Sequence, residues 1–367
     1  MKWNEQILQL NPYEPGKPIE EVKREYGLDQ VVKLASNENP YGQSAKVREK
    51  LTQLNIDYAI YPNGNATDLR SAVASFLNVK PTQLIFGNGT DEVLQILSQA
   101  LLGPEKNTVM AKGTFSQYKH NAVIEGAEIR EVPLKNGYHD LDNMLEAIDE
   151  DTAIVWLCSP NNPTGTYIKE KEIKSFLNRV PKNVLVVLDE AYYEYVVADD
   201  YYDALSLLSE YENLLVTRTF SKIYGLASFR VGYGIASERI IQKLEPIRQP
   251  FNTNVLGQYA AAIALKDQDF VTKCRRLNRE GLKQFYDFCQ KHGLSYYESQ
   301  ANFILIDFAR DGDDVFQFLL KNGFIVRSGK ALGFPTCIRI TVGTAEQNNA
   351  IIQLLEKYLS EAIQAEK

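Results

Sequence analysis

The chain has 367 residues, of which 44% are hydrophobic and 24% are charged, and both fractions are ordinary for a soluble globular protein. This length exceeds the size at which a single hydrophobic core usually stops growing, so we expect two domains. With 40 basic and 47 acidic residues, the formal net charge is −7 at pH 7. That balance disfavours binding to nucleic acids or to anionic membranes, because both require a basic surface.

We expect a protein of the reducing cytoplasm. The first residues, MKWNEQILQL, lack the apolar core of a secretion signal. The longest apolar runs, such as 184–188 and 259–265, are too short to span a bilayer. The four cysteines form no CxxC pair, and the spacing of the three histidines does not suit a metal site, so we expect no bound metal.

In chain order, residues 1–45 are rich in proline and asparagine and predict an extended arm with one short strand at 31–34. From residue 66, Leu69, Val73 and Phe76 follow helical spacing. Apolar runs then alternate with helix-like segments, which predicts an α/β fold with a mostly parallel sheet covered on both faces by helices. The runs are 83–86, 108–111, 127–132, 153–157, 184–188, 214–218 and 231–235.

After residue 265 the pattern changes to long amphipathic helices separated by short strands, which predicts a smaller α+β domain. We therefore divide the chain into an N-terminal arm that joins the small domain, 1–45, a large domain, 46–265, and a small C-terminal domain, 266–367.

Ligands of such sheets bind beyond the carboxyl ends of the strands, and polar residues follow five of the predicted strands. In IFGNGTDEV, 85–93, a glycine-rich turn precedes a helix, whose free N–H groups suit a phosphate. An ordinary strand-to-helix turn would look the same. The loop SPNNPTG, 159–165, is rigid enough to aim the amide of Asn162 at a ligand, although asparagines are also common in plain turns.

Two further strand ends carry ionisable groups. Asp189 ends the apolar run 184–188, where a carboxylate is costly without a cation or a donor, and Tyr192 follows three residues later. The alternative is a helix-capping aspartate. Lys222 would be a nucleophile if burial lowered its pKa, while Ser221 and Arg230 suit a phosphate. A solvated lysine is the simpler alternative.

The fifth strand end, GTFSQY at 113–118, offers the flat face of Phe115, although most such aromatic side chains belong to the core. Together the five ends supply a phosphate site, a neutral amine, an acid for a ring nitrogen, an amide and a phenol for a ring oxygen, and an aromatic face. Pyridoxal 5′-phosphate needs this whole set.

The sequence resembles the fold-type I pyridoxal-phosphate aminotransferases, and among them the histidinol-phosphate aminotransferases of Gram-positive bacteria. The resemblance covers almost the whole chain. Its strings are YEPGKPIE, KLASNENPYG, SPNNPTG, LDEAYYEY, RTFSKIYGLASFRVGYG, VRSGKALGFP and IRITVGT. It implies transamination of histidinol phosphate with 2-oxoglutarate to imidazole acetol phosphate and glutamate, in histidine biosynthesis, with aromatic amino acids as further donors.

The resemblance also implies residue roles. Lys222 would bind the cofactor covalently and move the proton, Asp189 would face the pyridinium nitrogen, and Phe115 would stack on the ring. Asn162 and Tyr192 would hold the ring hydroxyl, with Asn162 also near the substrate and Tyr192 close to the catalytic steps. The phosphate ligands would be Gly89, Thr90, Asp91, Thr219, Ser221 and Arg230.

Four implied roles concern the substrate and the partner. Tyr61 would reach the cofactor phosphate of a neighbouring subunit, which implies a homodimer with shared active sites. Arg339 would bind the substrate carboxylate and Arg327 the phosphate of histidinol phosphate. Tyr13 would close over the substrate.

The sequence departs from the family at one turn, since family members have proline where Gly113 stands, two residues before Phe115. Two readings other than transamination use the same cofactor. A decarboxylase of amino-acid phosphates would share the fold but release carbon dioxide. A cofactor-binding regulator would need a DNA-binding module, for which the residues before the first strand are too few.

Overall fold

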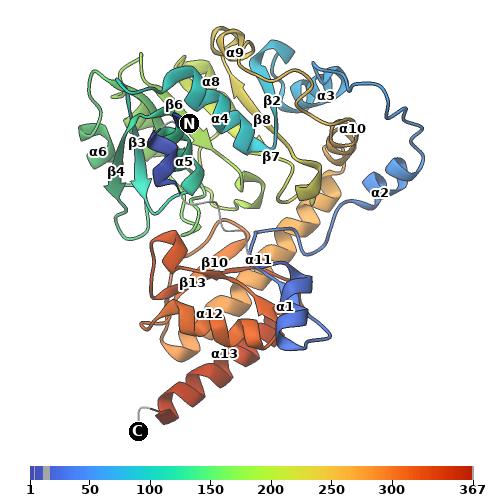
Figure 1. The fold of residues 1–367 in the computed structure, drawn as a ribbon, viewed down its shortest axis with the longest axis vertical. Coiled ribbons are helices and arrows are strands. Elements are labelled where there is room, and N and C mark those ends of the chain that lie inside the picture. The colour runs from blue at the N-terminus through green and yellow to red at the C-terminus, as the bar shows by residue number, and fades with distance from the viewer. Residues whose placement is uncertain (4, 11–16, 366–367) are drawn as a thin grey trace.

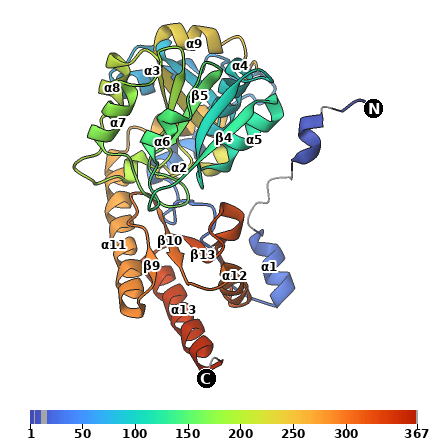
Figure 2. The same ribbon diagram turned by 90° about the vertical axis from the view of Figure 1, so that its left-hand side faces the viewer.

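The computed structural model describes residues 1–3, 5–10 and 17–365. A large part, with a central sheet between helices, lies above a smaller part built from the C-terminal third of the chain (Figure 1). Helix α11, Gln268–His292, runs from one part to the other along one side of the molecule (Figure 2). None of the helices in the described ranges has the length and apolar character needed to cross a membrane.

The large part is built on a seven-stranded sheet with the order β2-β8-β7-β6-β5-β3-β4. All its strands run in one direction except β8, which is antiparallel to both β2 and β7. The predicted α/β fold with a mostly parallel sheet is therefore confirmed. The strands are β2 Leu84–Asn88, β3 Asn107–Lys112, β4 Glu128–Pro133, β5 Thr152–Cys158, β6 Leu185–Asp189, β7 Leu214–Thr219 and β8 Val231–Ala236.

Both faces of this sheet are buried under helices, which explains why its central strands are continuously apolar. Along β6, Val186 and Leu188 pack into one hydrophobic cluster, whereas Leu185 and Val187 pack into another on the opposite face. The surrounding helices are α2 Ala45–Thr52, α3 Thr67–Leu77, α4 Thr90–Leu101, α5 Ser116–Glu125, α6 Leu141–Glu146, α7 Glu170–Leu177, α8 Ala204–Glu210, α9 Glu238–Leu244 and α10 Val255–Ala264.

The smaller part has a four-stranded antiparallel sheet with the order β12-β13-β10-β9, which packs against α11, α12 and α13. Its elements are β9 Ser295–Tyr296, β10 Phe303–Asp307, α12 Gly312–Lys321, β11 Phe324–Ile325, β12 Arg327–Ser328, β13 Cys337–Thr341 and α13 Ala345–Ala365. The 3₁₀ turns of the described chain are Glu5–Gln9, Pro81–Gln83, Tyr193–Tyr195, Ala227–Phe229 and Lys330–Leu332. The domain boundaries that we predicted from the sequence, at residues 46 and 266, remain a proposal.

The N-terminal arm differs from the extended segment that we predicted. Its strand is present as β1, Val32–Lys33, and pairs in parallel with β11. Residues 19–26, however, form helix α1, Ile19–Tyr26, which packs beside α12 in the smaller part (Figure 2). The prediction was wrong there because the proline-rich sequence indicated an extended segment, although residues 19–26 have a short apolar face on a helix. Val22 on that face is fully buried against Leu320 and Ile325.

The direction of β8 decides which residues meet at the carboxyl edge of the large sheet. The parallel strands β5, β6 and β7 end at this edge, and the antiparallel β8 begins there. Thr219 at the end of β7 is paired with Gly232 near the start of β8. Arg230, directly before β8, therefore lies beside the ends of strands that precede it in sequence.

Candidate active site

A cavity of about 190 Å³ lies at this carboxyl edge. It is lined from the large part by strand ends and from the smaller part by β13. Most of the residues that the sequence singled out meet in it. The lining residues are Ser36, Asn37, Thr90, Asp91, Phe115, Cys158, Asn162, Asp189, Ala191, Tyr192, Thr219, Ser221, Lys222, Arg230 and Arg339.

Lys222 enters the cavity from the loop after β7. Its Nζ donates to the carbonyl of Ser36 at 3.3 Å and lies 5.6 Å from the centre of the Tyr192 ring. Burial lowers the pKa of this amine from its ordinary value to about 8, and the positive charge of Arg339 adds to the effect. A substantial neutral fraction near pH 8 makes Lys222 available as a nucleophile or a base.

Asp189 lies at the end of β6 with only 3% of its surface exposed. Its carboxylate accepts a hydrogen bond from the Tyr118 hydroxyl at 2.6 Å and one from the Ala191 amide at 3.2 Å. Burial raises the pKa of this group. Because these donors are neutral, a cation in the cavity would favour the ionised form of Asp189. A protonated ring nitrogen would supply that charge.

The first turn of α4 and the Arg230 guanidinium form a site for an anion. Gly89, at φ +80°, lets the guanidinium lie against the helix start, since an added Cβ would stand 2.4 Å from Arg230 Nη2. Arg230 also donates to the Ser221 hydroxyl at 3.4 Å and pairs with Asp91 at 3.2 Å. Thr90 fixes the helix start by donating to the carbonyl of Arg218. Unpaired helix N–H groups beside a guanidinium suit a phosphate.

Three side chains connect the two sheets across the cavity. Arg339, on β13, donates from Nη1 to Asn162 Oδ1 at 2.6 Å and from Nη2 to the carbonyl of Ala35 at 2.6 Å. Asn162 in turn donates to the Tyr192 hydroxyl at 3.4 Å. The predicted amide and phenol thus lie together, next to one of the two predicted substrate arginines.

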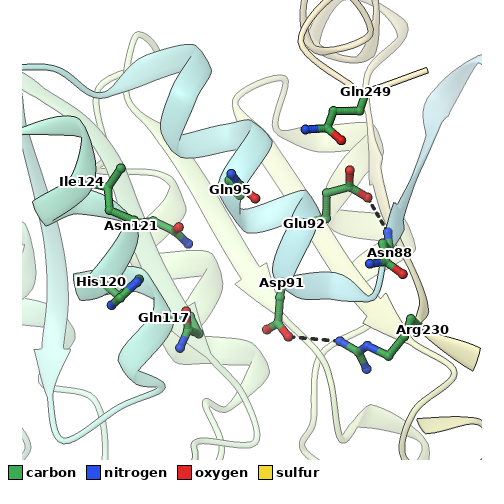
Figure 3. A pocket seen from close by; sticks show the side chains of 10 residues that line it. All are labelled: Asn88, Asp91, Glu92, Gln95, Gln117, His120, Asn121, Ile124, Arg230 and Gln249. Atoms are coloured by element: carbon green, nitrogen blue, oxygen red, sulfur yellow. Dashed lines mark hydrogen bonds and ion pairs between the residues drawn. The ribbon is translucent and has the colours of Figure 1, made fainter. Parts of the chain in front are cut away.

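A second cavity, of about 500 Å³, lies between the starts of α4 and α5 (Figure 3). Asp91 and Arg230 line both cavities, and Figure 3 shows their ion pair at one side of this outer space. Its other lining side chains are mostly carboxamides, with Glu92 and His120. We therefore place the chemistry in the inner cavity, which holds the lysine amine.

Comparison with known proteins identifies the family of the chain. The model of the family "aminotransferase class I and II" matches residues 29–355. The chain belongs to the aminotransferase class I and II family. Two relatives are histidinol-phosphate aminotransferases, from Bacillus licheniformis (63% identity, covering 96% of this chain and 98% of the relative) and Bacillus subtilis (60%, covering 98% and 100%).

Among solved structures, the chain is similar to the histidinol-phosphate aminotransferase of Sinorhizobium meliloti in complex with pyridoxal-5′-phosphate. The TM-score is 0.89 at 26% identity, and the alignment covers 100% of this chain and 98% of that chain. The fold predicted by the resemblance is therefore that of a solved aminotransferase.

The structure explains the departure from the family at Gly113. This residue has φ +90°, which the ring of a proline forbids. A Cβ at Gly113 would lie 3.1 Å from the ring of Phe334, in the loop between β12 and β13. The glycine therefore makes room for an aromatic contact between the two parts of the molecule. Phe115, two residues later, lines the cavity, and its stacking on a cofactor ring stays a prediction.

Three residues with implied roles lie away from the inner cavity or outside the described chain. Tyr61 is 78% exposed and stacks on Phe251 with ring centroids 4.7 Å apart. Arg327 is half-buried on β12 and does not line the cavity, but it lies directly opposite Arg339 in the sheet register. Tyr13 falls outside the described residues.

Tyr118 and Asn37 are among the residues at the site to which sequence reasoning gave no role. Tyr118 donates to Asp189 and stacks on Trp156, with ring centroids 4.9 Å apart. Its place three residues after Phe115, on the first turn of α5, was an available signal. Asn37 donates to the Tyr192 hydroxyl at 2.9 Å. It lies in the string KLASNENPYG, but more than 150 residues separate it from Tyr192, so no local pattern could have found the contact.

The lowered pKa of Lys222 predicts an unusual pH dependence of its reactivity. In the cofactor-free protein, acetylation by trace acetic anhydride should rise with a midpoint near pH 8, because only the neutral amine reacts. Lys80 is the internal control, since its hydrogen bond with Glu238 raises its pKa. Peptide mass spectrometry over a pH series measures both. Equal midpoints for the two lysines would contradict the buried, desolvated amine.

The Gly113 contact predicts a stability difference between two matched variants. Gly113→Ala and Gly333→Ala both place a side chain at positive φ, which costs about 1–2 kcal/mol, but nothing lies within 4 Å of the Gly333 position. Gly113→Ala should lower the free energy of unfolding in urea by about 1 kcal/mol more, because it displaces the Phe334 ring.

The double variant Gly113→Ala, Phe334→Ala separates the contact from backbone strain. Removing the ring should abolish the excess cost of the alanine. If the excess persists without Phe334, the close contact is not its cause.

Proposed function

We propose that this aminotransferase uses pyridoxal 5′-phosphate to transfer the amino group of histidinol phosphate to 2-oxoglutarate, in histidine biosynthesis. The observation that carries the proposal is the convergence of the Lys222 amine, the Asp189 carboxylate and the Arg230 guanidinium on one cavity. The names of the relatives at 60% and 63% identity support this donor. Phenylalanine and tyrosine are proposed as further donors.

The residues of the cavity fit the cofactor group by group. Gly89, Thr90 and Arg230 would hold its phosphate, and Asp189 would hold a proton on its ring nitrogen. Bound pyridoxal phosphate supplies an aldehyde that reacts with amines and a ring that withdraws electrons. Lys222 Nζ would hold that aldehyde, and the same amine would be the group that moves the substrate proton.

The remaining phosphate ligands would be Asp91, Thr219 and Ser221, while Phe115 would cover the face of the ring and Asn162 and Tyr192 would hold the ring oxygen. The buried position of Lys222 suits proton transfer, because a base with a pKa near the working pH is efficient in both directions.

The two substrates need an anion site on the smaller part. Arg327 and Arg339 are directly opposite on neighbouring antiparallel strands, so their side chains leave the sheet on the same face. Histidinol phosphate has a phosphate and no carboxylate, whereas glutamate has two carboxylates. A pair of arginines, one at the cavity wall and one beyond it, accommodates both. We propose that Arg339 binds the carboxylate, Arg327 the phosphate, and Tyr13 the outer side of the substrate.

The decarboxylase alternative shares the cofactor and the fold, but the relatives above are aminotransferases, so transamination is favoured. We also propose a cytoplasmic location, with which the four free, buried cysteines are compatible.

We further propose a homodimer in which Tyr61 reaches the cofactor phosphate of the second copy. Tyr61 lines no part of the inner cavity of its own chain. Other large apolar side chains near it are exposed as well, and such a patch favours an interface. They are Tyr58 and Ile60, which are close to it in sequence, and Phe251, which stacks on it.

A half-reaction tests the donor. Histidinol phosphate alone, added to the cofactor-loaded protein, should change the visible absorption of the cofactor and release imidazole acetol phosphate. Arg327→Ala should lower kcat/KM for histidinol phosphate by roughly 10- to 100-fold, because a charged hydrogen bond to the phosphate is lost. It should affect phenylalanine much less.

Arg179→Ala, in the turn after α7 with an exposed side chain, is the control and should leave kcat/KM unchanged for both donors. An equal loss with both donors would remove Arg327 from the phosphate site. Carbon dioxide release without an oxo product would favour the decarboxylase.

Subunit complementation tests the shared site. Lys222→Ala should be inactive, and Tyr61→Ala should bind the cofactor weakly. A hybrid dimer of the two, made by co-expression with different tags, has one site with both native residues if Tyr61 serves the partner. Activity should then recover to roughly half of the native value per dimer at limiting cofactor. A purified hybrid without recovered activity would mean that Tyr61 serves its own subunit or neither.

A further inference from the structure

Asn37 is a buried residue on which both sheets and the cavity converge. It is 1% exposed and has φ +59°, a left-handed conformation that asparagine tolerates better than most residues. Its backbone N–H donates to the Thr341 hydroxyl at 3.0 Å, and its backbone carbonyl accepts from Asn302 Nδ2 at 2.9 Å. Thr341 ends β13 and Asn302 precedes β10, so the backbone of Asn37 is fixed to the smaller part.

The side-chain amide of Asn37 can be oriented from its partners. The Thr341 hydroxyl already accepts from the Asn37 backbone, and its own proton points to Asn37 Oδ1 at 3.0 Å. With the amide reversed, the hydroxyl would accept twice and its buried proton would lose this acceptor. The oxygen therefore faces Thr341, and Nδ2 donates to the Tyr192 hydroxyl at 2.9 Å.

Asn162 is oriented by the same reasoning. Arg339 is only a donor, so Asn162 Oδ1 must face it, which turns Asn162 Nδ2 toward Tyr192. The phenolic oxygen of Tyr192 thus accepts from two amides, through both of its lone pairs. The phenolic proton of Tyr192 is therefore available to a third group. Because Tyr192 lines the cavity, that group can be a ligand in the cavity.

We propose that Asn37 is a positioning residue that fixes Tyr192 as a hydrogen-bond donor toward the ring oxygen of the cofactor. The inference rests on the cofactor proposed above. An acceptor in place of the Asn37 amide would turn the Tyr192 proton away from the cavity. The ring oxygen would then lose one of its two proposed donors, Tyr192, without any change in the residues that touch the cofactor.

The test is Asn37→Asp, which keeps the shape of the side chain and replaces the donor with an acceptor. The readout is the pH midpoint of the visible absorption change of the cofactor-loaded protein, together with the cofactor dissociation constant. A donor stabilises negative charge on the ring oxygen, which increases when the lysine-linked nitrogen loses its proton. Loss of the donor should therefore raise the midpoint by roughly one pH unit or more.

A double-mutant cycle with Tyr192→Phe separates this route from the charge of the new aspartate. If Asn37 acts through Tyr192, Asn37→Asp should raise the midpoint in the native background and add almost nothing in the Tyr192→Phe background. The neighbouring charged groups Arg339, Lys222 and Asp189 are unchanged in all variants, so they do not contribute to a difference in midpoint between the two backgrounds. An equal shift in both backgrounds would overturn the proposal, because it would come from charge alone.

Two further variants cover folding and amide orientation. Asn278→Asp makes the same change at a buried amide that contacts Ala301 in the smaller part, and it should leave the midpoint unchanged. Thr341→Val removes the hydroxyl that orients Asn37 and should raise the midpoint by a smaller amount than Asn37→Asp. If Asn37→Asp does not fold, Thr341→Val provides the test. An unshifted midpoint in the variant that folds overturns the role of Asn37.

The cofactor itself is checked on the native chain. Failure of the native chain to take up pyridoxal phosphate would overturn the proposed function together with this role. Normal uptake with unshifted variants would overturn the role of Asn37 alone.

Discussion

The buried carboxylate of Asp189 is the constraint on which the site depends. Its neighbour Glu190 is equally buried but is neutralised inside the protein, since Arg218 donates to it from two nitrogens at 2.8 Å and lies over the Tyr193 ring. Asp189 receives neutral donors instead. A buried acid beside an open cavity, next to one whose charge is already paired, indicates that its counter-charge comes from a ligand. The role proposed for Asp189, holding a cationic ring nitrogen, rests on this contrast.

Sheet topology brings the other charges to the same place. Parallel strands alone would put Asp189 and Lys222 at one edge, because both follow strands that end there. Arg230 joins them only because β8 runs in the opposite direction and starts where β7 ends. In the proposed function, the ring nitrogen and the phosphate of one ligand would thereby be held by residues on two adjacent strand connections. The anion site and the acid are consequently fixed by the same set of sheet hydrogen bonds.

The sequence predicted what is local and missed what depends on distant contacts. The apolar runs marked the strands of the large sheet, and the polar residues after them include most of the cavity lining. Helix α1 was missed, because its burial depends on Leu320 and Ile325. The glycine at position 113 could be noticed as unusual, but its contact with Phe334, more than 200 residues away, could not. The role proposed for Asn37 likewise depends on Thr341, a partner that no spacing rule could supply.

The segment around Asn37 therefore does more than lead into the large part. Leu34 accepts from the Thr341 backbone, Asn37 contacts both β13 and Tyr192, and Asn39 donates to the carbonyl of Ile223 beside Lys222. We expect a displacement of the small sheet, which carries Arg339, to affect the lysine loop and the phenol, because the backbone and side chains of one short segment bond to all of them. In the proposed function, substrate anions bound by Arg339 would thus act on a part of the protein that is hydrogen-bonded to the groups that would hold the ring.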